Sequence, residues 1–150
     1  MKIIFLDYDG VINTLMFDKG CSTPRFYFPK DNKVNNFQAV MWLNKLCLET
    51  GAKIVVTSSW RLWDNYCDVL YNSGLLESIE IIGKTENLGD RDVEIKEYLA
   101  HTLEPIESFL VLDDDRIKGF EKNQIKCDIY IGFNFYGYRR ALKILGKGDA

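Results

Sequence analysis

The feature that most constrains this chain is an unbroken apolar strand that ends in two carboxylates. The stretch IIFLDYDGVIN covers residues 3–13, in which four apolar residues, Ile3–Leu6, precede Asp7 and Asp9. A strand that is apolar on both faces is typical of a parallel sheet covered by helices on both sides. In such sheets, ligands bind at the carboxyl ends of the strands. The pattern therefore predicts a buried parallel strand whose end carries a polar site.

Apolar runs and amphipathic stretches alternate along the rest of the chain. We expect further strands at 53–57, 79–82, 109–112 and 129–131, and helices at about 35–50, 62–72, from Asp90 or Asp92 to near Pro105, and 138–145. This alternation predicts an α/β fold with a single doubly wound parallel sheet, Rossmann-like, with helices on both faces. The 150 residues suit one domain, 1–150, with a small flap or loop insertion at about 14–33 and no room for a full cap domain.

Charge and cysteine usage exclude several classes of protein. The formal net charge of -3 gives no footprint for broad binding of nucleic acid or anionic membrane, although it leaves local basic patches open. The first apolar run is too short for a signal peptide or a membrane span. Four cysteines without a CxxC pair and a single histidine disfavour zinc and fit a reducing compartment, so we expect a cytoplasmic protein.

Polar residues follow three of the expected strands. TSSWR (57–61) follows the second strand, and three carboxylates (113–115) follow the fourth. The carboxyl ends of parallel strands meet at one edge, where so many carboxylates would repel one another. A divalent cation relieves that conflict, and oxygen ligands favour Mg²⁺, which prefers a phosphate as a further ligand. Thr57 and Ser58 could donate to phosphate oxygens, and the available cations are Arg61, Lys84, Arg91 and Lys96.

These motifs carry a family resemblance. DYDGV, IVVTSSW and VLDDD, in this order and each at a strand end, resemble the haloacid dehalogenase (HAD) superfamily of phosphohydrolases over residues 3–115. GVIN and TSSWR resemble, more narrowly, the compact HAD domains associated with RNA-repair proteins. The resemblance implies a magnesium-dependent phosphomonoester hydrolase that acts through an aspartyl-phosphate intermediate. It also implies an open site for an accessible phosphate, such as a nucleic-acid end or a phosphoprotein.

The resemblance also implies a role for individual residues. Asp7 matches the nucleophile, and Asp9 matches the general acid and base, with its backbone carbonyl on the metal. Thr57 matches the hydroxyl that holds the phosphoryl group. The family's cationic clamp matches Arg91, with Lys84 as the alternative.

The remaining site residues are assigned to the metal and the substrate. With Asp7 and Asp9, the residues that match the metal site are Asp113 and Asp114. Those expected to bind substrate are Ser58, Arg61 and Lys84, and further substrate contacts are expected from Trp60, Arg25 and Lys30.

Other interpretations of the same residues stay open at this point. DxDG also begins calcium loops, although Asp7 follows a strand and the twelfth position is Asp18 instead of glutamate. A receiver-like domain or a non-catalytic phosphate-binding module could cluster similar side chains, and a small phosphometabolite could be the substrate. Trp60 and Trp63 fit packing better than base stacking.

Overall fold

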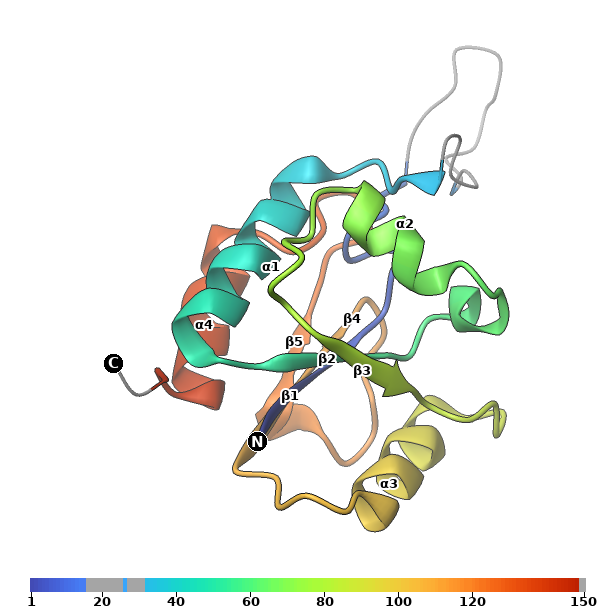
Figure 1. Cartoon of the computed structure of the whole chain (residues 1–150), viewed down its shortest axis with the longest axis vertical. Coiled ribbons are helices and arrows are strands. Elements are labelled where there is room, and N and C mark those ends of the chain that lie inside the picture. The colour runs from blue at the N-terminus through green and yellow to red at the C-terminus, as the bar shows by residue number, and fades with distance from the viewer. Residues whose placement is uncertain (16–25, 27–31, 149–150) are drawn as a thin grey trace.

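The computed structural model describes residues 1–15, 26 and 32–148, and its centre is a five-stranded sheet (Figure 1). Every strand pairing is parallel, and the strand order is β3-β2-β1-β4-β5. The strands are β1 (Lys2–Leu6), β2 (Lys53–Val56), β3 (Ile81–Lys84), β4 (Ser108–Asp113) and β5 (Gln124–Lys126). The predicted fold class, a doubly wound parallel α/β sheet, is confirmed.

Helices cover both faces of the sheet because successive strand side chains point to opposite sides. On one face, Ile4 and Leu6 pack in a core with α1 (Phe37–Thr50), α2 (Tyr66–Asn72) and α4 (Phe135–Leu145). On the other face, Ile3 and Phe5 pack in a second core with α3 (Arg91–His101). The central strand β1 is therefore buried on both sides, as its sequence predicts.

Capping residues set the ends of α1 where the sequence predicts them. The Asn36 side chain accepts a hydrogen bond from the backbone N–H of Ala39. Gly51 ends the helix in the left-handed conformation, with φ of 74°, which glycine adopts without steric cost. This helix presents Val40 and Leu43 to the sheet.

The prediction of a strand at 129–131 is wrong, because β5 lies at Gln124–Lys126. The Asp128 side chain accepts hydrogen bonds from the backbone N–H groups of Tyr130 and Ile131, and its carbonyl accepts from Gly132. Asp and Gly at these positions form a turn, in which Ile131 is exposed. Local hydrogen bonding by Asp128 thus outweighs the β propensity of the apolar run.

Smaller differences concern element bounds. β3 begins two residues later than predicted, and α4 begins three residues earlier, because Asn134 caps it through the backbone N–H of Gly137. The predicted helix at 62–72 is divided into a 3₁₀ turn, η2 (Ser59–Leu62), and α2. The helix predicted to reach near Pro105 ends at His101, so Leu103 lies beyond the end of α3 and is fully exposed.

The segment after β1 leads to α1. Most of the predicted flap at 14–33 lies outside the described residues, as do Arg25 and Lys30. At the near end of this segment, the backbone N–H of Thr14 donates to the side chain of Asn35. Among the described helices, none has both the length and the apolar character needed to cross a membrane.

Candidate active site

The centre of the sheet brings three strand ends together. The backbone N–H of Asp7 donates to the carbonyl of Leu112 in β4 at 3.0 Å, and that of Thr57 donates to Leu6 in β1 at 2.8 Å. Asp113 is the last residue of β4. The side chains that follow β1, β2 and β4 therefore share one edge of the sheet, as the sequence predicts.

Three carboxylates form a cluster at this edge. One oxygen each from Asp7, Asp113 and Asp114 lies within 4.8 Å of the others. Burial raises the pKa of Asp7 well above its ordinary value, Asp113 raises it further, and Arg91 lowers it. Burial also raises the pKa of Asp113 to about 7. Like charges held this close in a buried place are stable only with a compensating cation or bound protons.

Gly10 allows the third carboxylate to approach. Its φ is +84°, and a Cβ built at this position would lie 2.5 Å from the Cβ of Asp114. Any side chain would therefore be strained at this position and would displace Asp114 from the cluster. The glycine of the DxDG motif thus serves both the turn after β1 and the packing of a residue about one hundred positions away.

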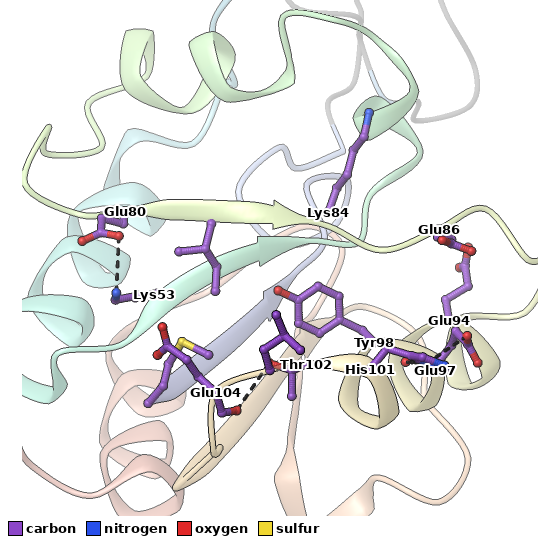
Figure 2. A pocket seen from close by; sticks show the side chains of 13 residues that line it. Lys53, Glu80, Lys84, Glu86, Glu94, Glu97, Tyr98, His101, Thr102 and Glu104 are labelled. Carbon is purple, nitrogen blue, oxygen red and sulfur yellow. Dashed lines mark hydrogen bonds and ion pairs between the residues drawn. The ribbon is translucent and has the colours of Figure 1, made fainter.

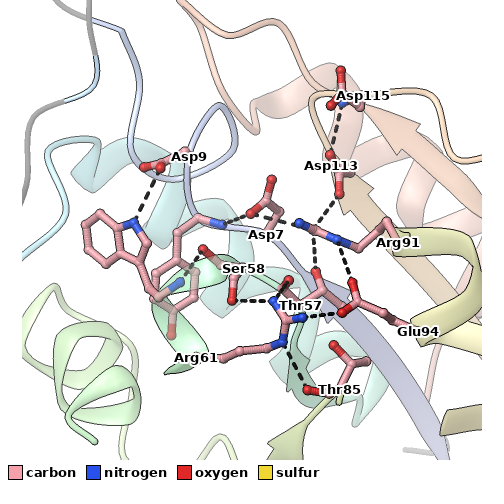
Figure 3. A network of polar contacts seen from close by, with 12 residues as sticks. Asp7, Asp9, Thr57, Ser58, Arg61, Thr85, Arg91, Glu94, Asp113 and Asp115 are labelled. Carbon is pink, nitrogen blue, oxygen red and sulfur yellow. Dashed lines mark hydrogen bonds and ion pairs between the residues drawn. The ribbon is translucent and has the colours of Figure 1, made fainter. Parts of the chain in front are cut away.

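Arg91 is the cation at the cluster, and Figure 3 shows it between Asp7 and Asp113. Its Nη1 lies 2.8 Å from Oδ2 of Asp113, 3.7 Å from Oδ1 of Asp7 and 3.1 Å from Oγ1 of Thr57. Arg91 is the first residue of α3, so the helix start fixes where its side chain begins. The geometry thus brings together four of the residues predicted for the site, Asp7, Thr57, Arg91 and Asp113.

Arg61 lies inside the protein instead of in the cleft. Its side chain is 4% exposed, and its guanidinium donates to the carbonyls of Thr57 at 2.7 Å, Ser58 at 2.9 Å and Thr85 at 3.0 Å. It also contacts the carboxylate of Glu94. Arg61 therefore ties the Thr57–Ser58 turn to the segment after β3, and its donors face protein groups instead of a substrate.

Glu94 is a site residue that the sequence analysis missed. It is buried on α3, where one oxygen pairs with Arg61 and the other lies 3.7 Å from Nε of Arg91. The backbone N–H of Leu88 also donates to it, at 3.1 Å. The signal in the sequence is slight, because Glu94 is one of two acids in the first turn of a helix, where acids are common.

Ser58 and Lys84 lie apart from the carboxylate cluster. The buried Ser58 hydroxyl accepts a hydrogen bond from the backbone N–H of Trp60 and caps η2. Lys84 donates to the carbonyl of Arg61 at 2.9 Å and lies over the ring of Tyr66 at 5.0 Å. Between the two clamps predicted from the sequence, Arg91 is the one that the structure brings to the carboxylates.

The side chain of Asp9 forms its hydrogen bonds with residues outside the cluster. Its Oδ1 accepts a hydrogen bond from the Asn13 side chain at 2.9 Å, and its Oδ2 accepts one from the indole N–H of Trp60 at 3.3 Å. Burial raises the pKa of Asp9, whereas these two hydrogen bonds lower it. Trp60 is buried against Tyr8, as the packing interpretation expects, but it also positions Asp9.

A cavity of about 700 Å³ lies between β3 and α3 (Figure 2). In its lining, Lys53 forms an ion pair with Glu80 at 3.4 Å, and His101 contacts Glu97 at 3.0 Å. The acidic cluster, by contrast, holds three carboxylates against one arginine. Among the described residues, the strand-end cluster is the group in which three carboxylate oxygens lie within 4.8 Å of one another, so this cluster, and not the cavity, is the candidate active site.

Comparison with known proteins gives one match. A family model described as the HAD domain in Swiss Army Knife RNA repair proteins matches residues 3–135. No curated protein and no solved structure matches the chain. The matched region includes every residue of the acidic cluster, together with Thr57, Arg91 and Glu94.

Proposed function

Since the chain belongs to the family of HAD domains in Swiss Army Knife RNA repair proteins, we propose that it is a phosphohydrolase whose nucleophile is Asp7. The observation that supports this most directly is the arrangement around Asp7. A buried carboxylate at the end of the central strand faces Arg91, which also contacts Thr57 and Asp113. This arrangement combines a nucleophile with cationic and hydroxyl donors for a phosphoryl group.

Mg²⁺ fits the donor set of this site. Asp7, Asp113 and Asp114 offer three oxygens within 4.8 Å of one another, and Arg91 is the one cation within 4.0 Å of them among the described residues. In our proposal these three residues hold the ion, together with the backbone carbonyl of Asp9. When bound, the ion offsets carboxylate charge and draws electron density from the phosphoryl oxygens.

In the first half of the proposed reaction, a carboxylate oxygen of Asp7 forms a bond to phosphorus. The bond from phosphorus to the leaving oxygen breaks, and that oxygen takes a proton from Asp9. The backbone N–H of Tyr8 donates to Asp7 at 2.9 Å, which holds the carboxylate in position. Arg91 and Thr57 stabilise the charge that develops on the phosphoryl oxygens.

In the second half, Asp9 takes a proton from a water molecule, whose oxygen attacks the phosphorus of the aspartyl-phosphate. The bond between phosphorus and Asp7 breaks, which releases inorganic phosphate and restores the carboxylate. Burial raises the pKa of Asp9, which favours the protonated form that the first step requires. Trp60 and Asn13 favour its ionised form, which is the form that accepts a proton from water.

We propose as substrate an accessible phosphate monoester, such as a nucleic-acid end. The family to which the chain belongs is named for RNA repair proteins. In the described residues, the β2–β3 connection contains only η2 and α2, which is too little to form a cap domain over the cleft. A small phosphometabolite stays the second candidate substrate.

Phosphate release tests this proposal. Purified protein with Mg²⁺ should hydrolyse p-nitrophenyl phosphate and at least one member of a panel of phosphorylated oligonucleotides, phosphopeptides and phosphometabolites. Asp7→Asn should abolish turnover, whereas Asp115→Asn, which changes an exposed carboxylate of the loop after β4, should retain it. Full turnover by Asp7→Asn would contradict the proposal, and stoichiometric phosphorylation without turnover would favour a receiver-like domain.

A further inference from the structure

The charges of this chain are segregated along the sequence. Residues 116–148 contain eight of the chain's 19 Lys and Arg residues but only two of its 22 Asp and Glu residues. This region therefore carries a formal charge of +6, while the rest of the chain carries -9. A net charge of -3 conceals this asymmetry, and the distribution of charge predicts anion binding better than the total does.

The basic side chains of this region are exposed and available. All eight are on the surface: Arg116, Lys118, Lys122, Lys126, Arg139, Arg140, Lys143 and Lys147. Within the described part of the chain, none of them forms an ion pair within 4.0 Å, whereas Lys2, Lys45, Lys53 and Lys96 each do. Cations on a surface attract a polyanion most strongly where no carboxylate pairs with them at close range.

Two of these cations lie beside a small cavity next to the candidate active site. Lys126 and Arg140 both line a cavity of about 190 Å³ between the end of β5 and the first turns of α4, and the exposed Tyr136 lines it with them. The one carboxylate in its lining is Asp128, which already accepts hydrogen bonds from two backbone N–H groups. The cavity thus combines two cations with an aromatic ring.

This cavity is one strand away from Asp113, which ends β4, and two strands away from Asp7, which follows β1. Lys126 is the register partner of Asp113 in the pairing of β4 with β5. The backbone N–H of Cys127, another lining residue, donates to the carbonyl of Asp113 at 2.8 Å. Neighbouring strands are about 5 Å apart, so the end of β5 lies about 10 Å from Asp7, which follows β1 two strands away.

We propose that this cavity, with Lys126, Arg140 and Tyr136, binds the strand of a nucleic acid whose terminal phosphate is at Asp7. Lys126 and Arg140 contact backbone phosphates next to the terminal one, and Tyr136 stacks on a base. Arg139, which lies over the Phe135 ring at 5.8 Å, adds a further cation beside the same helix turn. A concave lining that mixes cations and aromatic rings favours a single strand over a flat anionic membrane.

The inference rests on the proposed function for the identity of the reacting phosphate, but the binding of a strand can be measured separately. Lys126→Ala/Arg140→Ala should lower kcat/KM on a terminally phosphorylated hexaribonucleotide by about 10-fold or more. The same variant should leave kcat/KM on p-nitrophenyl phosphate unchanged, because this small substrate does not reach the cavity. Lys45→Ala/Lys53→Ala removes two charges that lie outside residues 116–148 and are paired with Glu49 and Glu80, and should match wild type on both substrates.

Binding is measured with Asp7→Asn protein and a labelled hexaribonucleotide without a terminal phosphate. Loss of the two contacts should reduce the slope of log Kd against log salt by about 1.4, since each contact on a single strand contributes about 0.7. Tyr136→Ala should weaken binding about 10-fold.

The two proposals fail in different ways. The enzyme could hydrolyse p-nitrophenyl phosphate while wild type and Lys126→Ala/Arg140→Ala show equal oligonucleotide kinetics and binding. That result overturns this inference and leaves the proposed phosphohydrolase activity intact. Absence of turnover on every substrate, together with strand binding that the double variant loses, overturns the phosphohydrolase and retains the binding surface. If Lys126→Ala/Arg140→Ala loses binding to phosphatidylserine vesicles but binds the oligonucleotide as wild type does, the surface binds a membrane and the inference is overturned.

Discussion

Removal of the Arg61 guanidinium should destabilise the protein and disorder the Thr57–Ser58 turn of the candidate active site. Arg61 donates to the carbonyls of Thr57, Ser58 and Thr85 and pairs with Glu94, and both members of this pair have side chains that are 4% exposed. Breaking a buried ion pair by removing one partner costs roughly 3–5 kcal/mol, because the other charge stays buried and unpaired. We expect Arg61→Met to lower the free energy of unfolding by about 3 kcal/mol, the lower end of this range. The reason is that Arg91 still lies 3.7 Å from Glu94 and partly compensates its charge.

Urea unfolding at 25 °C, followed by circular dichroism, measures this loss as a change in the free energy of unfolding. Arg61→Lys should lose about half as much, because lysine keeps the charge but not the planar fork that reaches several carbonyls. Lys53→Met breaks the more exposed pair with Glu80 and should cost less than about 1 kcal/mol. Turnover by Arg61→Lys should fall, because the carbonyl of Thr57 loses a hydrogen-bond donor and the Thr57 hydroxyl contacts Arg91 in the site.

A double-mutant cycle separates the pair from general packing. Arg61→Met/Glu94→Gln should be more stable than the sum of the single losses predicts, by about 2 kcal/mol, because no buried charge stays unpaired. A loss below about 1 kcal/mol for Arg61→Met, or strict additivity in the cycle, would refute the idea that this pair holds the site together.

Three more predictions concern the cleft itself. Arg91→Ala should lower kcat/KM by about 100-fold or more, while Lys84→Ala should have a much smaller effect. The reverse order in steady-state kinetics would show that Lys84, and not Arg91, is the cation that binds the phosphoryl group. The pKa of Asp113 is raised from 3.8 to about 7 in the folded protein, so its contribution to stability is complete at low pH and is lost as the pH rises. Without Mg²⁺, the free energy of unfolding should therefore fall between about pH 4 and pH 7. The fall should be smaller in Asp113→Asn and smaller when Mg²⁺ is added. A fall of equal size in Asp113→Asn would refute the assignment of this pH dependence to Asp113. Gly10→Ala should destabilise the protein by about 2 kcal/mol and weaken Mg²⁺ binding in calorimetry, since its Cβ would lie 2.5 Å from that of Asp114; wild-type affinity for Mg²⁺ in this variant would show that the contact does not matter.

The sheet and the strand-end acids could be predicted because both depend on local patterns. Apolar runs such as Ile3–Leu6 identify buried strands, and parallel pairing then places the residues that follow them at one edge. Asp7 and Asp113 were predicted in this way, and the structure places their side chains together. The prediction of a strand at 129–131 was wrong, because a hydrogen bond that the Asp128 side chain accepts from the backbone N–H of Tyr130 competes with extended structure, and no periodicity in the sequence reveals it.

The supporting contacts of the site could not be predicted, because they join residues that are far apart in the chain. Glu94 is an ordinary helical acid until folding places it between Arg61 and Arg91. Arg61 was predicted to bind substrate because it follows TSS, but the 3₁₀ turn directs its side chain into the protein. The depth at which a side chain lies depends on tertiary packing, which a motif does not encode.

Trapping of the aspartyl-phosphate on Asp7 tests the central claim most directly. In Asp9→Asn, p-nitrophenyl phosphate should still phosphorylate Asp7, because nitrophenolate leaves without a proton from Asp9, whereas hydrolysis should stall for lack of a base. After acid quenching, peptide mass spectrometry should find one phosphoryl group per protein, on Asp7, that hydroxylamine removes. Multiple turnovers without phosphoryl group on Asp7, or a stable phosphoryl group on another residue, would contradict Asp7 as the nucleophile.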